Sequence, residues 1–309
     1  MSGTRKPLTW LITGSSNGFG LALTRQVLAS GDNVIATSRN PQRTPELVQE
    51  VEAKSNGRWI GLDVCWSSER IAKVIAQAEA QFGGLDVVVN NAAYSILGAV
   101  EDVPEDQAKA EFETNFWGAL RVVKAILSGM RDRGSGTIVN VSSALGVTSW
   151  PACGLYSASK FALEGEFAPF VSFITLSLML TSLGMSQALA QEVKTFGIRV
   201  LIVEPGSFRT NFLAGGAMQI AGPSEPYKSP HPVGLSLQSE HEKNGKQPGD
   251  PVKAVQVIYN VVTGKTRGLG EILRLPLGSD CWEAGMKHNE SVRKDFEACK
   301  EMAFSVQIE

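Results

Sequence analysis

A glycine-rich turn near the start of the sequence restricts the possible folds more than any other feature. Leu8 to Thr13 is a short apolar run that predicts a buried strand, and T-G-S-S-N-G-F-G occupies residues 13–20. A helical pattern of leucine and valine then runs to Gly31, where a helix would end. Strand, turn and helix in this order form a phosphate-binding unit, because the helix N-terminus directs N–H groups at an anion. The first two glycines would allow the tight turn, and the third would allow close packing.

Strands and helices continue to alternate after this unit. Apolar runs predict further strands at residues 33–37, 59–62, 87–89, 138–141, 198–203 and 270–275. Helical patterns lie at residues 45–54, 68–82 and 105–130, and Asp250-Pro251 predicts the start of a helix that ends near Val262. This order predicts a Rossmann-type α/β fold, a doubly wound parallel sheet of about seven strands with helices on both faces and ligands at the carboxyl ends of the strands. We expect residues 1–309 to form a single catalytic domain.

The spacing of Tyr156 and Lys160 is typical of a catalytic pair on one face of a helix. Residues i and i+4 share a helix face, so the ammonium of Lys160 can lie beneath the phenol of Tyr156. A nearby cation lowers the pKa of a phenol from its usual value of about 10. The phenol can then both donate and accept a proton during a reaction. Ser143 follows the strand at 138–141 and could hold a substrate oxygen beside the phenol. Because Y-x-x-x-K is common, an ordinary exposed tyrosine is the alternative to a catalytic pair. Motifs elsewhere in the sequence are needed to choose between the two.

The end of the second strand indicates which dinucleotide the chain binds. An NAD-specific fold usually places a carboxylate there for the ribose 2′-hydroxyl. This sequence has none, and Arg39 stands where a 2′-phosphate would lie, which favours NADP(H) over an ordinary surface arginine. Asp63, at the end of the third strand, could bond the adenine amino group or cap the next helix.

Asparagines mark two further positions. N-N-A-A at residues 90–93 follows a strand, where small residues would let a cofactor lie against the backbone and an asparagine can tie adjacent strands together. Asn115 lies in the middle of a predicted helix, where asparagine is a mediocre helix former, and this suggests a role.

Composition excludes several other classes. Net charge is −2 and no basic run marks a nucleic-acid surface. The four cysteines are far apart without a C-x-x-C pair, and the three histidines lack metal-ligand spacing, so we expect neither disulfides nor a metal. The first residues lack the apolar stretch of a signal peptide, and we expect a reduced, cytoplasmic protein.

Together these motifs resemble the short-chain dehydrogenase/reductase family over roughly residues 8–280. The glycine turn matches T-G-x-x-x-G-x-G, N-N-A-A matches N-N-A-G with Ala93 in place of glycine, and Tyr156/Lys160 match Y-x-x-x-K. Ser143, Asn115 and Pro205-Gly206 also fall at family positions. V-I-A-T-S-R-N and L-R-L-P-L-G-S-D look most like the retinol- or steroid-dehydrogenase-like branch, fungal members included.

The resemblance implies a catalytic tetrad of Ser143, Tyr156, Lys160 and Asn115. Tyr156 would donate or accept the proton, Ser143 would orient the carbonyl, Lys160 would lower the phenol pKa and hold the nicotinamide ribose, and Asn115 would anchor a water. The implied cofactor-binding residues are Gly14, Ser16, Gly18, Phe19, Gly20, Arg39, Asp63, Asn91, Lys124, Tyr156, Lys160, Pro205, Gly206 and Thr210. For Lys124 a solvated lysine is the alternative.

The resemblance also implies the reaction. Hydride would pass between NADP(H) and a small apolar secondary alcohol or ketone without a metal. The partners would be this substrate and a second copy of the chain, with no nucleic acid. Residues 211–250, rich in Gly, Pro and Ser, would cover the substrate as a lid segment, with a disordered loop as the alternative.

Residues 166–184 depart from the family pattern. They add nineteen residues with one charge, Glu166, inside the helix that carries Tyr156 and Lys160, and Pro169 would break that helix. A membrane span would separate two halves of one sheet, so we expect none. Monotopic membrane contact or a cover over an apolar substrate remains an alternative. We favour a retained intron, because deletion restores the helix pattern. A non-catalytic NADP-binding sensor or scaffold, disabled by the insertion, is the rival to an enzyme.

Overall fold

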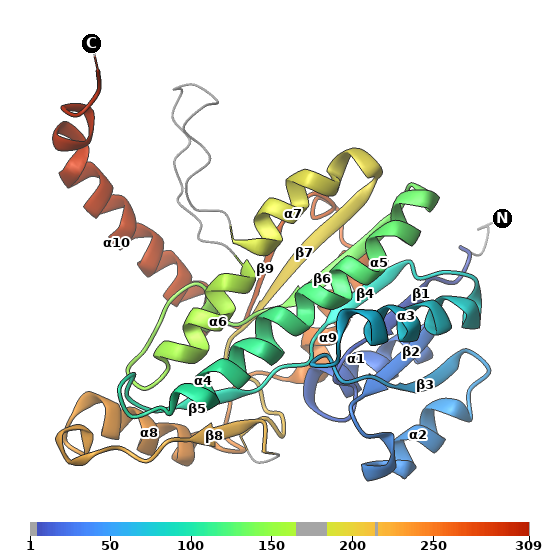
Figure 1. Cartoon of the computed structure of the whole chain (residues 1–309), viewed down its shortest axis with the longest axis horizontal. Coiled ribbons are helices and arrows are strands. Elements are labelled where there is room, and N and C mark those ends of the chain that lie inside the picture. The colour runs from blue at the N-terminus through green and yellow to red at the C-terminus, as the bar shows by residue number, and fades with distance from the viewer. Residues whose placement is uncertain (1–4, 165–183, 214–215, 309) are drawn as a thin grey trace.

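A parallel sheet forms the centre of the computed structural model, which describes residues 5–164, 184–213 and 216–308. Its seven strands have the order β3-β2-β1-β4-β6-β7-β9, and every neighbouring pair is parallel (Figure 1). The strands are β1 (Thr9–Ile12), β2 (Asn33–Ser38), β3 (Gly57–Gly61), β4 (Val87–Asn90), β6 (Gly136–Val141), β7 (Ile198–Pro205) and β9 (Arg274–Leu277). The order reverses between β1 and β4, so the predicted doubly wound Rossmann-type fold is confirmed.

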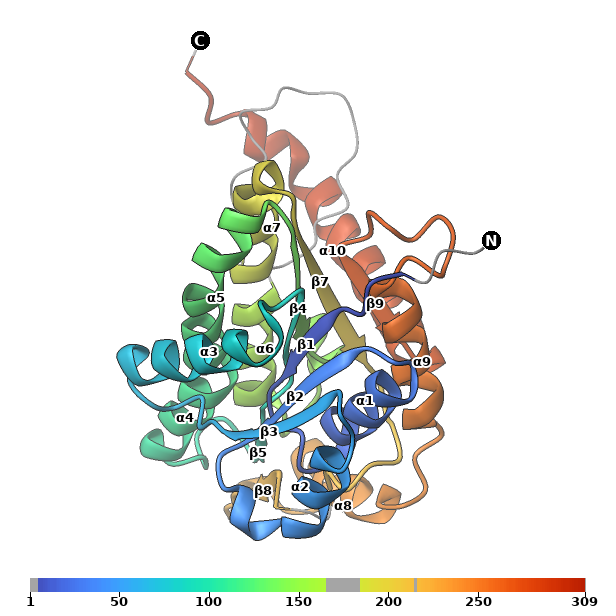
Figure 2. The same ribbon diagram turned by 90° about the vertical axis from the view of Figure 1, so that its right-hand side faces the viewer.

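Helices cover both faces of this sheet (Figure 2). One side carries α1 (Gly18–Ala29), α2 (Pro45–Glu52) and α9 (Pro251–Val262). The other side carries α3 (Ser68–Phe82), α4 (Glu105–Phe112), α5 (Ala119–Arg133), α6 (Gly154–Glu164) and α7 (Met185–Val193). α10 (Ser279–Phe304) follows β9 and extends away from the sheet (Figure 1).

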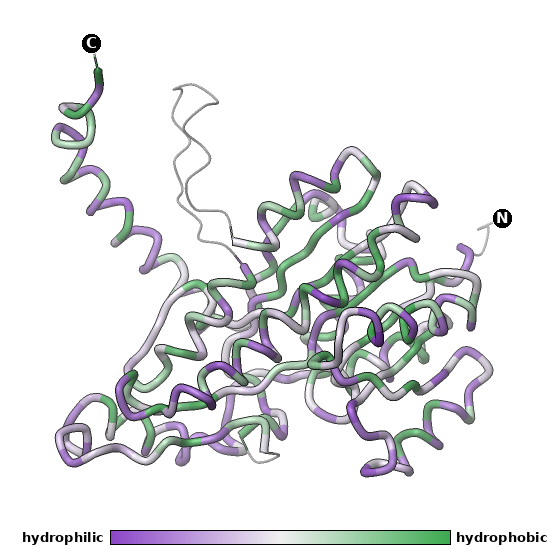
Figure 3. The backbone as a smooth tube through the Cα atoms, viewed as in Figure 1, coloured by the Kyte–Doolittle hydropathy of each residue, from purple (hydrophilic) through white to green (hydrophobic). Residues whose placement is uncertain are grey.

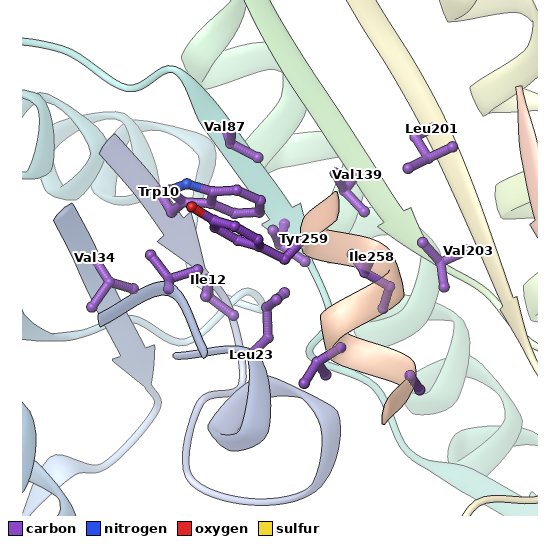
Figure 4. Packing of buried hydrophobic residues seen from close by; sticks show 14 of the residues in the cluster. Trp10, Ile12, Leu23, Val34, Val87, Val139, Leu201, Val203, Ile258 and Tyr259 are labelled. Atoms are coloured by element: carbon purple, nitrogen blue, oxygen red, sulfur yellow. The ribbon is translucent and has the colours of Figure 1, made fainter. Parts of the chain in front are cut away.

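Two apolar cores lie between the sheet and these helices. Successive strand residues face opposite sides, so Trp10 and Ile12 enter one core while Leu11 enters the other. The strands are therefore largely apolar, and β7 for example is mostly green in Figure 3, as expected for strands buried on both faces. In the first core the Trp10 and Tyr259 rings stack with centroids 5.6 Å apart (Figure 4). Tyr259 Oη donates to Asp32 Oδ2 over 2.9 Å, which satisfies the phenol inside the core.

Two predicted elements differ from the structure. The final strand is Arg274–Leu277, so the prediction of 270–275 was shifted, because pairing with residues 202–205 of β7 sets its limits. The helix predicted at 105–130 consists of α4, a π-helical turn at Glu113–Gly118, and α5. The π turn surrounds Asn115, at the centre of the predicted helix.

The lid segment contains regular structure that we did not predict from the sequence. β8 (Met218–Ile220) pairs with β5 (Ser95–Leu97), and α8 (Pro232–Lys243) follows. The α8 pattern is weak because only Val233 and Leu237 are buried. Its start is nevertheless encoded, since Pro232 occupies the first turn and the His231 ring accepts a hydrogen bond from the Val233 N–H.

The predicted insertion, apart from Gly184, lies outside the described residues. α6 ends at Glu164 and α7 begins at Met185, and Ser186 Oγ donates to Leu163 O over 2.5 Å. Among the described residues, no helix is long and apolar enough to cross a membrane.

Candidate active site

The carboxyl ends of the strands open into a cleft of about 740 Å³. Loops after six strands line it, together with α6 and the lid segment. The predicted site residues that line it are Gly14, Ser16, Gly18, Phe19, Arg39, Asp63, Asn91, Ser143, Tyr156, Lys160, Pro205, Gly206 and Thr210. Gly20, Asn115 and Lys124 do not line it. Thus one cleft brings together residues from widely separated parts of the sequence.

The glycine turn leaves a cradle between β1 and α1. Gly14 has φ +68°, and a Cβ there would lie 2.9 Å from the Cα of Ala92. Asn91 Nδ2 donates to Thr13 O over 2.9 Å and to Gly14 O over 3.2 Å. Gly20 packs against this arrangement, because a Cβ there would collide with the Gly14 carbonyl and the Asn91 side chain. Gly20 therefore has the close-packing role predicted from the sequence.

Arg39 and Asp63 lie at the ends of β2 and β3. Arg39 is exposed at the cleft and makes no hydrogen bond or ion pair with any described residue. The neighbouring Ser38 hydroxyl is occupied, because it accepts a bond from Trp59 Nε1 over 3.1 Å. Asp63 Oδ1 accepts from the Cys65 N–H over 2.9 Å, while Ser67 caps α3. Helix capping, the alternative role for Asp63, is therefore wrong.

Ser143, Tyr156 and Lys160 meet at the end of β6. The Ser143 hydroxyl lies close enough to the Tyr156 phenol to lower its pKa. Tyr156 is 7% exposed and Lys160 is 2% exposed, so neither side chain is the ordinary surface residue considered as the alternative. Lys160 Nζ donates to Val141 O over 3.0 Å and lies 5.8 Å from the centroid of the Tyr156 ring. The phenol and the serine hydroxyl can thus face one ligand oxygen, with the ammonium behind them.

Burial controls the protonation of this group. Burial raises the pKa of the Tyr156 phenol, and the neighbouring Ser143 hydroxyl partly lowers it. The sequence predicted a lowering by Lys160, but that ammonium is bonded to a backbone carbonyl. Burial also lowers the pKa of Lys160 to about 8, although the carboxyl groups of Glu164 and Glu111 act in the opposite direction.

A buried carboxyl pair supports the loop that carries Ser143. Ser142 Oγ donates to Glu164 Oε1, and Gly146 leaves no room for a Cβ beside them. Arg274 Nε lies 3.3 Å from Glu204 Oε1 and 4.0 Å from Glu164 Oε2. Burial raises the pKa of Glu204 to about 7 and that of Glu164 well above its usual value. Both carboxyl groups therefore hold their protons more tightly than an exposed glutamate does.

Asn115 lies behind the cleft. Its Oδ1 accepts from the Tyr94 N–H over 3.1 Å, and its Nδ2 donates to Tyr94 O over 2.9 Å and to Ser159 Oγ over 3.0 Å. Both amide hydrogens are therefore used within the protein, which limits how the side chain could anchor a water. Lys124 is exposed on α5 and outside the cleft, as its solvated alternative predicted.

Some residues of the cleft were not predicted. Its apolar wall includes Leu97, Leu145, Trp150, Cys153, Phe212 and Met218, and α8 adds Glu240 and Lys243. Gln247, beyond α8, also lines it. The pairing of His231 with Pro232 could have revealed α8, but no local pattern indicates that Gln247 reaches the cleft.

Comparison with known proteins decides the family. A family model described as short chain dehydrogenase matches residues 9–168, which include the glycine turn, Ser143, Tyr156 and Lys160. The chain belongs to the short-chain dehydrogenase family.

Relatives of this short-chain dehydrogenase match it over most of its length. Oxidoreductase BOA17 of Botryotinia fuckeliana is 34% identical over 296 residues, which cover 96% of this chain and 98% of BOA17. Human retinol dehydrogenase 8 is 32% identical over 83% of this chain and 78% of its own. A short-chain dehydrogenase structure from Streptomyces avermitilis has 36% identity and a TM-score of 0.82, and it covers 98% of this chain and 100% of its own. The predicted resemblance to the retinol-dehydrogenase-like branch, fungal members included, is confirmed, and the chain is an oxidoreductase of this family.

Proposed function

We propose that this short-chain dehydrogenase uses NADP(H) to interconvert an apolar secondary alcohol and a ketone. The observation that carries the proposal is the neighbouring pair of Ser143 and Tyr156, which lines the same cleft as the glycine turn. Two hydroxyl groups side by side can both bond one carbonyl oxygen. A dinucleotide that rests on the glycine turn would share the cleft with that carbonyl.

The residues of the cleft fit a nicotinamide dinucleotide. The bare backbone at Gly14 and the N-terminus of α1 suit a pyrophosphate, and Arg39 has a guanidinium without a partner among the described residues. When bound, the nicotinamide supplies or accepts the hydride. Distant structures of the fold hold either dinucleotide: a gluconate 5-dehydrogenase from Burkholderia cenocepacia with NADP (20% identity, TM-score 0.66) and a Burkholderia phymatum protein with NAD (16%, 0.73). The preference for NADP(H) therefore rests on Arg39.

Side chains of the cleft would supply the proton that the carbonyl oxygen gains on reduction. In the reductive direction the Tyr156 phenol donates its proton to the carbonyl oxygen while the Ser143 hydroxyl donates a hydrogen bond to the same atom. The Lys160 ammonium, held by Val141 O beside the phenol ring, would hold the nicotinamide ribose, as the resemblance implies. Asn115 acts as a positioning residue, because its side chain fixes Tyr94 and Ser159 rather than the cleft.

The chemistry of the cleft wall supports the substrate class. Leu97, Leu145, Trp150, Phe212 and Met218 give an apolar surface near Tyr156, whose ring centroid lies 6.5 Å from that of Phe212. The lid segment contributes Met218 of β8 to this apolar surface, and α8 adds the charged Glu240 and Lys243 to the cleft. An apolar ketone would bury its surface there while its oxygen meets the two hydroxyls.

Turnover by the Tyr156→Phe variant tests this function. The phenylalanine keeps the ring packing but removes the proton, so we expect kcat to fall by about 100- to 10,000-fold with NADPH and apolar ketones. NADPH binding, followed by fluorescence titration, should remain. The matched control is Tyr227→Phe, a tyrosine of the lid segment outside the cleft, which should keep wild-type turnover.

Two results would contradict the proposal. If the wild-type protein binds NADPH but reduces none of a panel of apolar ketones, the hypothesis of a non-catalytic sensor is favoured. A Tyr156→Phe variant as active as the wild type would remove Tyr156 from the chemistry.

A further inference from the structure

Gln247 has a buried side-chain oxygen that makes no hydrogen bond with any described residue. It is 5% exposed and lines the cleft beyond the end of α8. Its Oε1 atom is buried and has no hydrogen-bond partner among the described residues. A buried carbonyl oxygen without a donor is unfavourable, so such an atom in a cleft wall indicates that a ligand supplies the donor.

Contacts of its backbone locate Gln247 within the cleft. Its carbonyl oxygen accepts from Arg209 Nε over 3.3 Å and from Arg209 Nη2 over 3.1 Å. The Arg209 N–H in turn donates to Gly249 O over 2.9 Å, and the Gly249 N–H donates to Ser207 O over 3.0 Å. Residues 247–249 therefore run beside residues 207–209, the segment that follows Pro205-Gly206 at the end of β7.

That segment is next to the glycine turn. The Phe208 and Phe19 rings meet edge to face with centroids 5.1 Å apart. A Cβ on Gly18 would lie 3.8 Å from the Cβ of Thr210. Gln247 is thus placed on the side of the cleft where the end of β7 meets the glycine turn, rather than against the apolar wall formed around Cys153.

The chemistry of a dinucleotide selects which of its parts can meet Oε1. Phosphate oxygens only accept hydrogen bonds and cannot satisfy a carbonyl oxygen. The adenosine half also carries donors, but Arg39 and Asp63 mark its expected place at the ends of β2 and β3, whereas Gln247 lies beside the segment after β7. On that side the donors are the carboxamide NH₂ group and the ribose hydroxyls of the nicotinamide half. We propose that Gln247 is a cofactor-binding residue whose Oε1 accepts a hydrogen bond from the nicotinamide half of the bound dinucleotide. This inference rests on the proposed use of NADP(H).

The assignment gives the lid segment a second role. α8 places Glu240 and Lys243 in the cleft wall near Cys153. Burial raises the pKa of the Cys153 thiol, the charge of Glu240 raises it further, and that of Lys243 lowers it. Gln247, four residues after Lys243, would contact the cofactor from the same segment. Binding of the dinucleotide would therefore also fix the segment that covers the substrate.

Cofactor binding by a Gln247→Met variant tests the inference without turnover. Methionine keeps much of the side-chain volume but removes the acceptor oxygen. We expect the Kd for NADPH, from fluorescence or calorimetric titration, to rise about tenfold, because one buried hydrogen bond is lost. The Kd for 2′,5′-ADP, which lacks the nicotinamide half, should change less than twofold. Gln238→Met is the control, since Gln238 lies exposed on α8 and donates to Glu242 Oε1.

Three outcomes would overturn the inference: an unchanged Kd for NADPH, an equal weakening of NADPH and 2′,5′-ADP, or a higher ketone KM with NADPH binding intact. The last outcome would place the substrate, not the cofactor, at Gln247. Gln247→Leu, measured in parallel, shows whether the methionine itself disturbs the site, and both variants must keep the thermal unfolding midpoint of the wild type. Failure of the proposed function looks different, because the wild type would then bind NADPH without turnover, or bind NADH instead.

Discussion

Burial changes the proton affinity of three side chains around the active site. It raises the pKa of the Tyr156 phenol, lowers that of the Lys160 ammonium to about 8, and raises that of the Glu111 carboxyl to about 7. Glu111 is fully buried on α4. Its Oε1 accepts from the Ile96 N–H over 2.8 Å, while its Oε2 has no partner among the described residues. Each shift has the sign expected when a charge loses water.

Replacement of Glu111 by glutamine should change how stability depends on pH. A carboxyl with a raised pKa binds its proton more tightly in the folded state, so its contribution to stability is complete below about pH 4.5 and is lost as the pH rises through 7. Glutamine keeps the acceptor for Ile96 but cannot ionise. We expect Glu111→Gln to be more stable than the wild type by about 2–3 kcal/mol at pH 8 and similar to it at pH 4.5.

Urea unfolding at both pH values measures this difference. Glu105→Gln, on the exposed first turn of the same helix, should show no such pH dependence. The same free-energy difference between Glu111→Gln and the wild type at pH 4.5 and pH 8 would show that Glu111 is not neutral in the folded protein.

Arg39 should decide between the two dinucleotides. Its guanidinium lies at the cleft without a partner among the described residues, so a 2′-phosphate would be its first strong acceptor. Arg39→Asp replaces this cation by a carboxylate that can bond a ribose 2′-hydroxyl. We expect the Kd for NADPH to rise about 10- to 100-fold and NADH binding to improve. Arg43→Asp, a nearby exposed arginine outside the cleft, is the control, and an unchanged NADPH-to-NADH ratio in Arg39→Asp would refute the specificity argument.

At the scale of elements, α6 and α7 meet as two parts of one helix would. If residues 166–184 are left out of the count, Ser186 follows Leu163 by four positions. Its hydroxyl donates to the Leu163 carbonyl over 2.5 Å, which is the i to i−4 bond that serine makes within a continuous helix. Asn140 Nδ2 donates to the same hydroxyl over 2.8 Å and ties the junction to β6. The ends on either side of the insertion therefore already have helical register.

Deletion of residues 166–184 should raise both soluble yield and activity. The deletion would join α6 to α7 without a change of register and would remove the apolar stretch of sequence between them. NADPH oxidation by equal amounts of the two purified forms measures the effect. Removal of the last nineteen residues, most of them in the exposed part of α10, is the control for shortening the chain.

Unchanged or reduced activity of the deletion form would contradict this prediction. The origin of the insertion has a separate test. Spliced transcripts that lack these codons would support a retained intron, whereas full-length protein in the native organism would refute it.

At the scale of the whole molecule, the doubly wound sheet brings the site together. All seven strands are parallel, so their carboxyl ends meet at one edge. Contacts between distant parts of the chain close this arrangement: Asp32, after α1, accepts from Trp10 Nε1, Arg5 and the phenol of Tyr259, which lies 227 positions away. The last strand, β9, then pairs with β7 beside the loop that carries Pro205 and Gly206. The shape of the cleft therefore depends on contacts made along the whole sheet, from β1 and β2 to β9.

The sequence by itself determined the fold class, and most of the site residues that it predicted line the cleft. Apolar runs indicated strands that are buried on both faces. The glycine turn and the Tyr156/Lys160 pair could be identified because their residues are close in sequence as well as in the folded chain. Only the tertiary structure decided the rest, because burial and long-range contacts have no local pattern. It showed that Asn115 bonds Tyr94 and Ser159, that Lys124 is solvated, that Lys160 bonds Val141 O, and that Gln247 reaches the cleft with an unsatisfied oxygen. These properties arise from residues that are distant in sequence and close only in the folded chain.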